Sequence, residues 1–167
     1  MIETIIFALV LLSSYIISGS SAVAILSAAL TAAGFALVAI VAAIRKNGPQ
    51  AKQLGLKAAV FLLLAGGIYG LNALSSSHAR AGAERLAAAC ETYKEKTGAY
   101  PDTFSKLIPE YTKDIPAARF TAMWAQYRLV GTNIMFVLEP GLVAAAYDIP
   151  AKKWGVVSFS EMFPKKT

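Results

Sequence analysis

The chain has 167 residues, of which 56% are apolar, and it carries a formal net charge of +6. Its mean hydropathy of +0.54 is high for a globular protein, and the length allows one modest domain together with membrane-embedded segments. The charge is spread over both halves without a cluster of Lys and Arg among aromatic residues, which argues against a nucleic-acid-binding protein.

Two apolar segments open the chain. The first, "IIFALVLLSSYII", begins at Ile5 and ends at the small residues 18–21, and the second covers residues 22–44. A membrane-spanning helix needs about 20 apolar residues and at least about 17, so the second segment is long enough and the first is marginal. A single helix over both would be roughly 65 Å long, about twice the hydrocarbon thickness, so a tight hairpin is expected at residues 18–21. Cleavage of a signal peptide after Ala24 is the alternative, and the base-free start "MIET" disfavours it.

A basic loop, "RKNGPQAKQLGLK", covers residues 45–57 and overlaps a third apolar segment at residues 55–74. The loop contains four bases and no acid, and the positive-inside rule places such a loop in the cytoplasm. The expected path is therefore out, in and out again, with residues from about 75 onward in a periplasm or extracellular space. The predicted topology-determining residues are Arg45, Lys46, Lys52 and Lys57.

Small residues in the second and third segments predict close helix packing, because they let helix backbones approach one another in lipid. The packing can be within the chain's own three helices or against a partner membrane protein. The interiors of the segments lack acidic and basic residues, which argues against a transporter or a pump. The predicted helix-packing residues are Ala29, Ala33, Gly66 and Gly70.

Helix-forming sequence continues past the third segment and predicts one long helix over residues 53–97, half in lipid and half outside. Leu86, Cys90 and Tyr93 form an apolar stripe on its outer half, opposite a charged face. Cys90 is the only cysteine, so it has no internal disulfide partner and is expected to be a buried thiol. Gly98 is placed to cap the end of the helix.

The remaining sequence predicts a short helix and a small sheet. Asp102 is the expected N-cap of the helix "TFSKLI". The apolar runs "AQYRLV", "NIMFVLE", "LVAAAYD" and "WGVVSF" follow, with a hairpin turn at Gly131-Thr132 between the first two. An amphipathic helix in water must bury its apolar stripe, so four antiparallel strands are expected to pack one face against it. The side chains predicted to be buried there are Tyr127, Met135, Val137 and Trp154 or their neighbours.

This order of elements resembles the type IV pilins, and most closely the major pseudopilin of type II secretion. The resemblance rests on "YKEKTGAYPDTFSKLIPEY" after a long half-membrane helix, followed by a small antiparallel sheet, and on the closing "YDIPAKKWGVVSF", which is similar to pilin-like domains of small bacterial membrane proteins. Two additional apolar segments precede the long helix, so the resemblance implies a tethered pilin-like module rather than a filament subunit. The matching residues are Tyr93, Gly98, Tyr100, Pro101, Leu107, Tyr147, Asp148 and Trp154.

The predicted fold is therefore an α+β membrane protein. Residues 1–52 form a transmembrane hairpin and a cytoplasmic basic loop, and residues 53–167 form a pilin-like unit. Within that unit, residues 53–74 cross the membrane and residues 75–167 form the periplasmic or extracellular α+β domain, in which the long helix packs on a four-stranded antiparallel sheet.

No catalytic motif is present: the chain has no G-x-S-x-G, no P-loop, no G-x-G-x-x-G and no C-x-x-C. His78 is the only histidine, and Glu91 and Glu95 stand beside lysines, as expected of a solvated helix face. No catalytic residue, metal ligand or cofactor is predicted.

We therefore expect a non-catalytic, multi-pass protein of a bacterial inner membrane whose outer domain contacts other proteins, as an accessory or scaffold subunit of a membrane assembly. The expected partners are the lipid bilayer and another membrane protein or a second copy of the chain, and not nucleic acid. A divergent pseudopilin of a secretion or pilus system is one alternative. An outer ligand-sensing domain is another, and it would require a concave aromatic pocket around Tyr127, Trp154 or Trp124.

Overall fold

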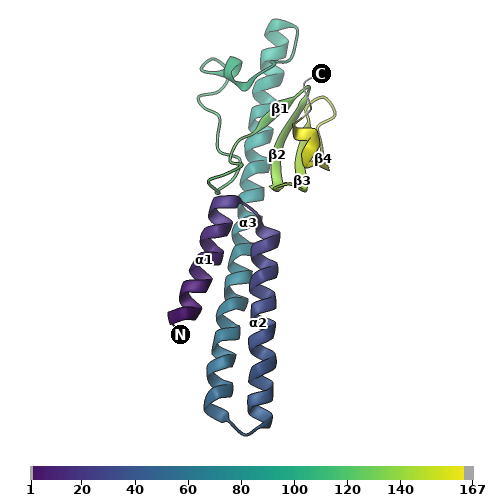
Figure 1. Cartoon of the computed structure of the whole chain (residues 1–167). Coiled ribbons are helices and arrows are strands. Elements are labelled where there is room, and N and C mark those ends of the chain that lie inside the picture. Colours follow the sequence, from purple (N-terminus) through teal and green to yellow (C-terminus); the bar gives the residue numbers. More distant parts are fainter. Residues whose placement is uncertain (1, 164–167) are drawn as a thin grey trace. The chain divides into compact units, whose positions relative to one another are not determined.

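The computed structural model describes residues 2–163, and the chain divides into two units, Met1–Ala73 and Leu74–Thr167 (Figure 1). The predicted α+β class is confirmed, because three helices precede a four-stranded antiparallel sheet. The helices are α1 (Ile2–Ser18), α2 (Ser21–Ile44) and α3 (Gly48–Thr97), the last of which belongs to both units. The second unit adds two 3₁₀ turns, η1 (Phe104–Leu107) and η2 (Phe159–Met162), and the strands β1 (Arg128–Val130), β2 (Asn133–Glu139), β3 (Val143–Asp148) and β4 (Lys153–Ser158).

The first unit is a helical bundle with the predicted hairpin between α1 and α2. The hairpin turns at Gly19, whose φ of 73° lies in the left-handed region that favours glycine. Two buried clusters hold the helices together, one around Tyr15 and Ile68 and the other around Phe61. Alanines of α2 complete both clusters and allow close approach of the helices: Ala24, Ala28 and Ala32.

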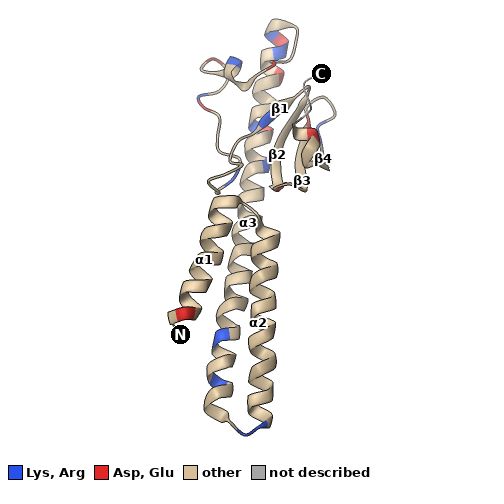
Figure 2. Cartoon of the chain, viewed as in Figure 1, with Lys and Arg blue, Asp and Glu red and all other residues tan. Residues whose placement is uncertain are grey.

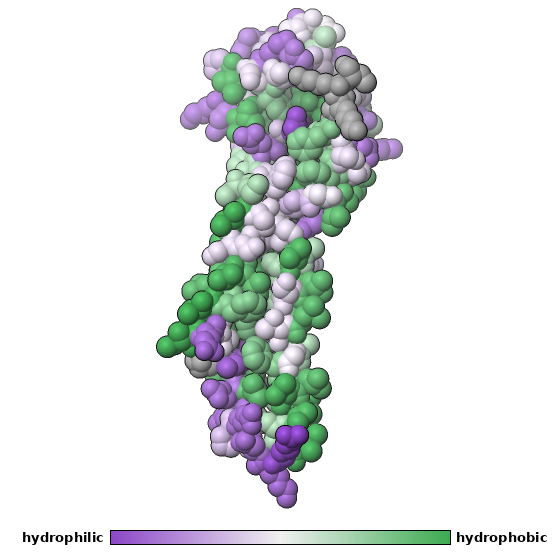
Figure 3. Space-filling model, viewed as in Figure 1, coloured by the Kyte–Doolittle hydropathy of each residue, from purple (hydrophilic) through white to green (hydrophobic). Residues whose placement is uncertain are grey.

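Two helices in the described part of the chain, α2 and α3, are long and apolar enough to cross a membrane, and α1 is a shorter apolar helix. No acidic or basic residue lies between Glu3 and Arg45 (Figure 2). Many apolar side chains of this unit point outward (Figure 3). Leu63, for example, is 77% exposed. An exposed apolar surface of this extent is typical of contact with lipid or with another protein.

The predicted helix-packing residues lie beside the buried positions of this unit. Ala29 is half-buried and Ala33 is exposed, each one residue after a buried alanine of α2. Gly66 is exposed and Gly70 is half-buried, and a Cβ atom added to either would meet nothing within 4 Å. Contacts of these residues with a partner helix therefore stay a prediction.

Helix α3 starts at Gly48, five residues before the predicted start at residue 53. The reason is Asn47, whose side-chain oxygen accepts a hydrogen bond from the backbone N–H of Gln50 at 3.3 Å and so caps the helix. Pro49 lies in the first turn, where its missing N–H removes no intrahelical hydrogen bond. The helix ends as predicted at Gly98, which has a φ of 84° and donates to the carbonyl of Lys94 at 2.8 Å.

The predicted capping role of Asp102 is wrong. The short helix is the four-residue 3₁₀ turn η1, its N-cap is Thr103, and no side chain caps it. A 3₁₀ turn of this length leaves few free N–H groups to cap. The carboxylate of Asp102 instead pairs with the ammonium group of Lys106 at 2.9 Å.

The four strands form a meander in the order β1-β2-β3-β4, with every neighbouring pair antiparallel. Val130 faces Asn133, so the predicted two-residue hairpin at Gly131-Thr132 is confirmed, and Gly131 has a φ of 61°. Strands β1 and β4 are the edges of the sheet.

The sheet buries apolar side chains on both of its faces. Ile134 and Phe136 of β2 pack with Leu86 and Cys90 of α3. Side chains alternate along a strand, so the residues between them point the other way. That second face is closed by Met162 of η2, together with Trp124 and Phe159.

The prediction for the buried face is therefore half right. Tyr127 is buried, and Trp154 is half-buried against the same cluster as α3. Met135 and Val137 are buried on the opposite face, away from the helix. Their positions in the strand have the opposite parity to Phe136, which decides the face that each side chain joins.

Close contact between α3 and the sheet occurs at Gly82. A Cβ atom at this position would collide with the hydroxyl of Tyr127 and would come within 3.1 Å of its Cζ atom. That hydroxyl donates a hydrogen bond to the carbonyl oxygen of Ala79 at 2.7 Å. Burial raises the pKa of Tyr127 to about 12.

The thiol of Cys90 is completely buried in the core cluster that also contains Tyr127, as predicted, and burial raises its pKa from 9.0 to about 11. Because burial disfavours the ionised thiol, the unfolded chain loses the Cys90 proton at a lower pH than the folded domain. The contribution of this group to the unfolding free energy is therefore fully present below pH 9.0, and it is lost as the pH rises from 9.0 through about 11. One pKa unit corresponds to about 1.4 kcal/mol.

We therefore expect Cys90→Ala to reduce the alkaline loss of unfolding free energy. Denaturant titrations at neutral pH and above the ordinary pKa of the thiol measure this loss. Tyr127 is present in both proteins, so its own titration cancels in the comparison. Equal alkaline losses in the two proteins would contradict the prediction.

Candidate interaction site

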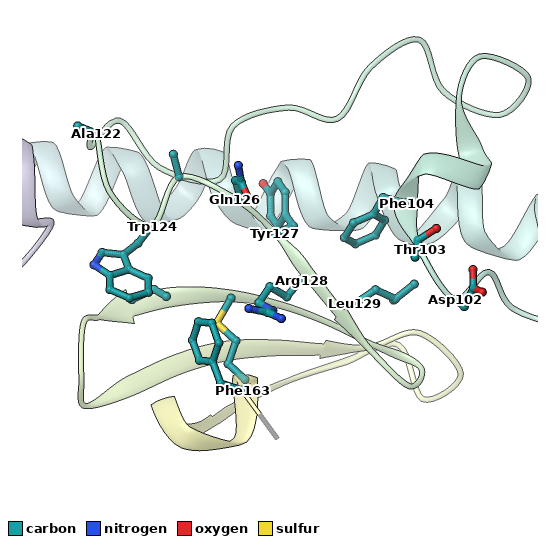
Figure 4. A pocket seen from close by; sticks show the side chains of 13 residues that line it. Asp102, Thr103, Phe104, Ala122, Trp124, Gln126, Tyr127, Arg128, Leu129 and Phe163 are labelled. Carbon is teal, nitrogen blue, oxygen red and sulfur yellow. The ribbon is translucent and has the colours of Figure 1, made fainter. Parts of the chain in front are cut away.

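An open groove with a volume of about 570 Å³ runs along β1 in the second unit. Figure 4 shows Trp124 and Ala122 at one end of the groove and Asp102 and Thr103 at the other. Phe104 and Leu129 provide apolar walls near the second end. The remaining lining residues are Ala125, Gln126, Tyr127, Arg128, Val137, Met162 and Phe163.

One side of β1 is paired with β2, and the other side is a free sheet edge. An edge strand presents backbone N–H and C=O groups that can pair with a further strand. Extended peptides bind to sheet edges in this way, and pockets for alternate side chains add specificity. The groove therefore combines backbone groups with side-chain pockets.

Arg128 supplies the positive charge of the groove. Its guanidinium lies over the ring of Phe163, 4.4 Å from the ring centroid, and the arginine is exposed. Among residues 2–163 it forms no ion pair. A guanidinium group stacked on an aromatic ring still presents its N–H donors to a carboxylate at its edge.

A closed loop holds Trp124 at its end of the groove. The backbone N–H of Ala118 donates to the carbonyl of Ala125 at 2.6 Å, which closes the loop. Inside it, the hydroxyl of Thr121 donates to the carbonyl of Met123 at 2.7 Å. Trp124 has a φ of 62°, a conformation that costs about 1–3 kcal/mol for a residue other than glycine and that persists only where the surroundings impose it.

Arg119 fixes this loop to the sheet. Its side chain is 2% exposed, and one guanidinium nitrogen donates to the carbonyls of Val137 at 3.2 Å and Leu138 at 2.8 Å. Trp124 is packed edge-on against Phe159, with 5.2 Å between the ring centroids. The indole is therefore placed by the fold.

Of the three aromatic residues predicted to surround a pocket, two line the groove. Trp124 and Tyr127 lie there, whereas Trp154 packs on the side of the sheet that faces α3. Arg128 and Phe163 were not predicted from the sequence. The alternation of apolar Tyr127, charged Arg128 and apolar Leu129 in the sequence was a signal for an outward-facing arginine, but no local pattern places Phe163 beside it.

The residues of the pilin-like motif lie in the helix end, the core and the turns of the second unit. Tyr93 contacts Tyr111, Tyr100 lies beneath the ammonium group of Lys94, and Pro101 and Leu107 are buried. Gly98 ends α3. Tyr147 and Trp154 face each other across β3 and β4 with ring centroids 5.0 Å apart, and Asp148 accepts a hydrogen bond from the backbone of Ala151.

The predicted topology-determining residues lie at the turn between α2 and α3 and in the first turns of α3 (Figure 2). Arg45 and Lys46 follow α2 directly, and the ammonium group of Lys57 lies over the ring of Phe35 at 5.5 Å. Together with Lys52, these residues are the lysines and arginines of the first unit in the described part of the chain.

The few candidates for chemistry are not brought together. His78 is exposed and lies beside Phe120, with 5.2 Å between the ring centroids. Glu91 pairs with Lys152 at 3.6 Å. Within residues 2–163, no group of three His, Cys, Asp or Glu side chains could hold a metal ion.

The fold and the groove define an α+β chain with two long apolar helices and a small sheet domain that has an open edge. No family model matches the chain, and neither a curated protein nor a solved structure is significantly similar to it.

Proposed function

We propose that the chain is a non-catalytic, membrane-anchored interaction subunit whose sheet domain binds an extended segment of a partner protein in the groove along β1. The observation that carries this proposal is the groove itself, which combines aromatic rings, an exposed arginine and a free sheet edge. The two long apolar helices support an anchor in a bacterial inner membrane, and the basic segment at residues 45–57 supports, by the positive-inside rule, a sheet domain on the outer side.

The chemistry of the groove indicates the partner segment. A strand added to β1 would form backbone hydrogen bonds and alternate its side chains between the two sides. An apolar or aromatic side chain of that strand would pack against the rings of Trp124 and Phe163, which contact each other edge-on, and a carboxylate would reach Arg128. The partner segment is therefore expected to be extended, acidic and partly aromatic.

Site-specific photo-crosslinking in the native membrane tests this proposal. A photoreactive side chain at Gln126, which lines the groove, is expected to give one discrete adduct that purifies in stoichiometric yield. Arg128→Glu should lower the yield about tenfold or more, which corresponds to 1.4 kcal/mol.

Ala88 is the matched control position, because it is exposed on α3 and does not line the groove. The same adduct from Ala88 would contradict a groove-specific contact. An adduct at Gln126 that Arg128→Glu leaves unchanged would contradict the acidic partner segment.

A divergent pseudopilin is the second candidate, and the 50-residue helix α3 that leads into an antiparallel sheet favours it. Intact-mass measurement of the chain purified from its membrane separates the two proposals. A chain trimmed near residue 55 supports a processed pseudopilin, and a full-length chain supports the tethered subunit.

A further inference from the structure

We propose that one end of the sheet domain rests in the headgroup region of the bilayer that α3 enters. This end, here called the apolar end, consists of residues 119–124, the β2–β3 turn at residues 140–142 and Phe163. The inference adds a lipid contact to the proposed function and rests on its membrane anchor.

Exposed apolar side chains are concentrated at the apolar end. Six large apolar residues after Leu74 are exposed in the described part of the chain, and four of them lie here. Water-soluble domains rarely gather such side chains in one place unless the surface contacts something apolar. The four residues are Phe120 (59% exposed), Met123 (49%), Leu142 (62%) and Phe163 (37%).

The strand register brings these residues together, although they are distant in sequence. Strand β1 is antiparallel to β2, so the loop before β1 and the turn after β2 lie at the same end of the sheet. The hydrogen bonds from Arg119 to the carbonyls at the end of β2 confirm this placement of the loop. Phe159 donates to the carbonyl of Leu142 at 3.0 Å, which brings the segment ending at Phe163 to the same place.

The apolar end is the end of the sheet domain that meets the start of the outer half of α3. Contacts between the sheet domain and α3 follow an order. The farther a contact lies from the apolar end, the later its α3 residue stands in the sequence. The first involves Ser75, which directly follows Leu74, the last residue of the apolar run. In order, the contacts are Phe120 N to Ser75 Oγ (3.2 Å), Tyr127 Oη to Ala79 O (2.7 Å), Trp154 Nε1 to Glu84 Oε1 (3.1 Å) and Lys152 Nζ to Glu91 Oε1 (3.6 Å).

The opposite end of the same domain is charged. Lys152 lies in the turn between β3 and β4, and Asp148 at the end of β3 faces Lys153 at the start of β4. The last turns of α3 add Glu91, Lys94, Glu95 and Lys96. Polarity therefore rises along α3 with distance from the apolar run.

This gradient identifies lipid as the occupant of the apolar end. Ser75 directly follows the apolar run of α3 in the sequence. A surface attached there is held at the membrane–water boundary, where tryptophan and other amphipathic rings are enriched. Phe120, Met123 and Leu142 would enter the boundary, and Trp124 would lie at the level of the headgroups.

Fluorescence quenching by brominated lipid tests this inference, because the chain has only two tryptophans, Trp124 and Trp154. The variant W154F reports on Trp124 alone, and W124F reports on Trp154 alone. The bonding partner of Trp154, Glu84, is nine residues beyond Ser75, which is about 14 Å along a helix.

The full chain is reconstituted in phosphatidylcholine vesicles whose acyl chains are brominated near the glycerol end. We expect Trp124 to lose emission at least about twofold, as an interfacial indole should, and Trp154 to lose little. Equal quenching of the two tryptophans, or none of Trp124, would overturn the inference.

A depth control separates failure of this inference from failure of the membrane anchor. Leu63 lies in the apolar run and is 77% exposed, so L63W in the chain without native tryptophans reports on insertion of α3. Quenching of this residue by lipid brominated near the middle of the acyl chain, together with an unquenched Trp124, would overturn the headgroup contact alone. An unquenched L63W would overturn the anchor and with it the headgroup contact.

Discussion

Replacing Gly82 with alanine is expected to lower the unfolding free energy of the sheet domain by about 1–3 kcal/mol, the usual cost of forcing extra atoms into a packed interior. The added methyl group would occupy the position of the Tyr127 hydroxyl. The ring would have to move and give up its hydrogen bond to Ala79. Alanine is otherwise the better helix former by up to about 1 kcal/mol, so destabilisation would show that the contact decides the outcome.

Two further variants isolate the contact in chemical denaturation experiments. Tyr127→Phe removes the colliding oxygen, so G82A should cost much less in that background, and the coupling between the two changes measures the clash. Gly155→Ala, in strand β4, is the control for an added methyl group without a collision, because a Cβ atom there would meet nothing within 4 Å. Equal effects of G82A with and without the hydroxyl would contradict this account.

The second large effect is expected at Arg119. Arg119→Met should lower the unfolding free energy by about 2–4 kcal/mol, because a buried charged donor to two backbone carbonyls is lost and the carbonyls remain buried. The loop at residues 119–124 should then become accessible to proteases before the rest of the domain, since Arg119 attaches it to β2.

Arg85→Met is the control of the same chemical type, because Arg85 is exposed on α3 and its substitution should change stability by no more than about 0.5 kcal/mol. The loss of unfolding free energy in Arg119→Lys should lie between those of Arg119→Met and Arg85→Met, since an ammonium group lacks the forked N–H donors of the guanidinium. Denaturant titration and limited proteolysis measure both effects. A methionine at position 119 that leaves the loop protected would contradict the anchoring role of the arginine.

Local rules made much of the helical and hairpin structure predictable from the sequence. Long apolar runs identified the helices, and Gly98 and Gly131 marked turns that require positive φ. Errors occurred where two local rules competed. The basic residues 45–57 were predicted to form a loop, but Asn47 caps a helix that starts at Gly48 and tolerates Pro49 in its first turn.

The faces of the sheet were harder to predict because β2 is apolar throughout. A run such as Ile134–Val137, buried at all four positions, carries no alternation that separates one face from the other. The second face became evident only with η2, which follows the last strand and covers Met135 and Val137. Tertiary packing determines this layer.

The candidate groove was only partly predictable for the same reason. The two aromatic residues Trp124 and Tyr127 could be proposed because they stand near a strand in sequence. Phe163 is more than thirty residues from Arg128, and only the return of the chain across the sheet places its ring under the guanidinium. Pairs of this kind depend on topology rather than on spacing.

Closure of the second sheet face by η2 also has a consequence for the order of synthesis. Phe159 and Met162, which cover Met135, Val137 and Ala144 together with Trp124, are translated after all four strands, so the nascent sheet leaves that apolar face incompletely covered until residues 159–162 have been added. Pairing of β1 with β2 requires only local sequence and can occur earlier. The domain is therefore expected to mature in two stages, with a vulnerable interval in which its strands are paired but one face is still incompletely covered.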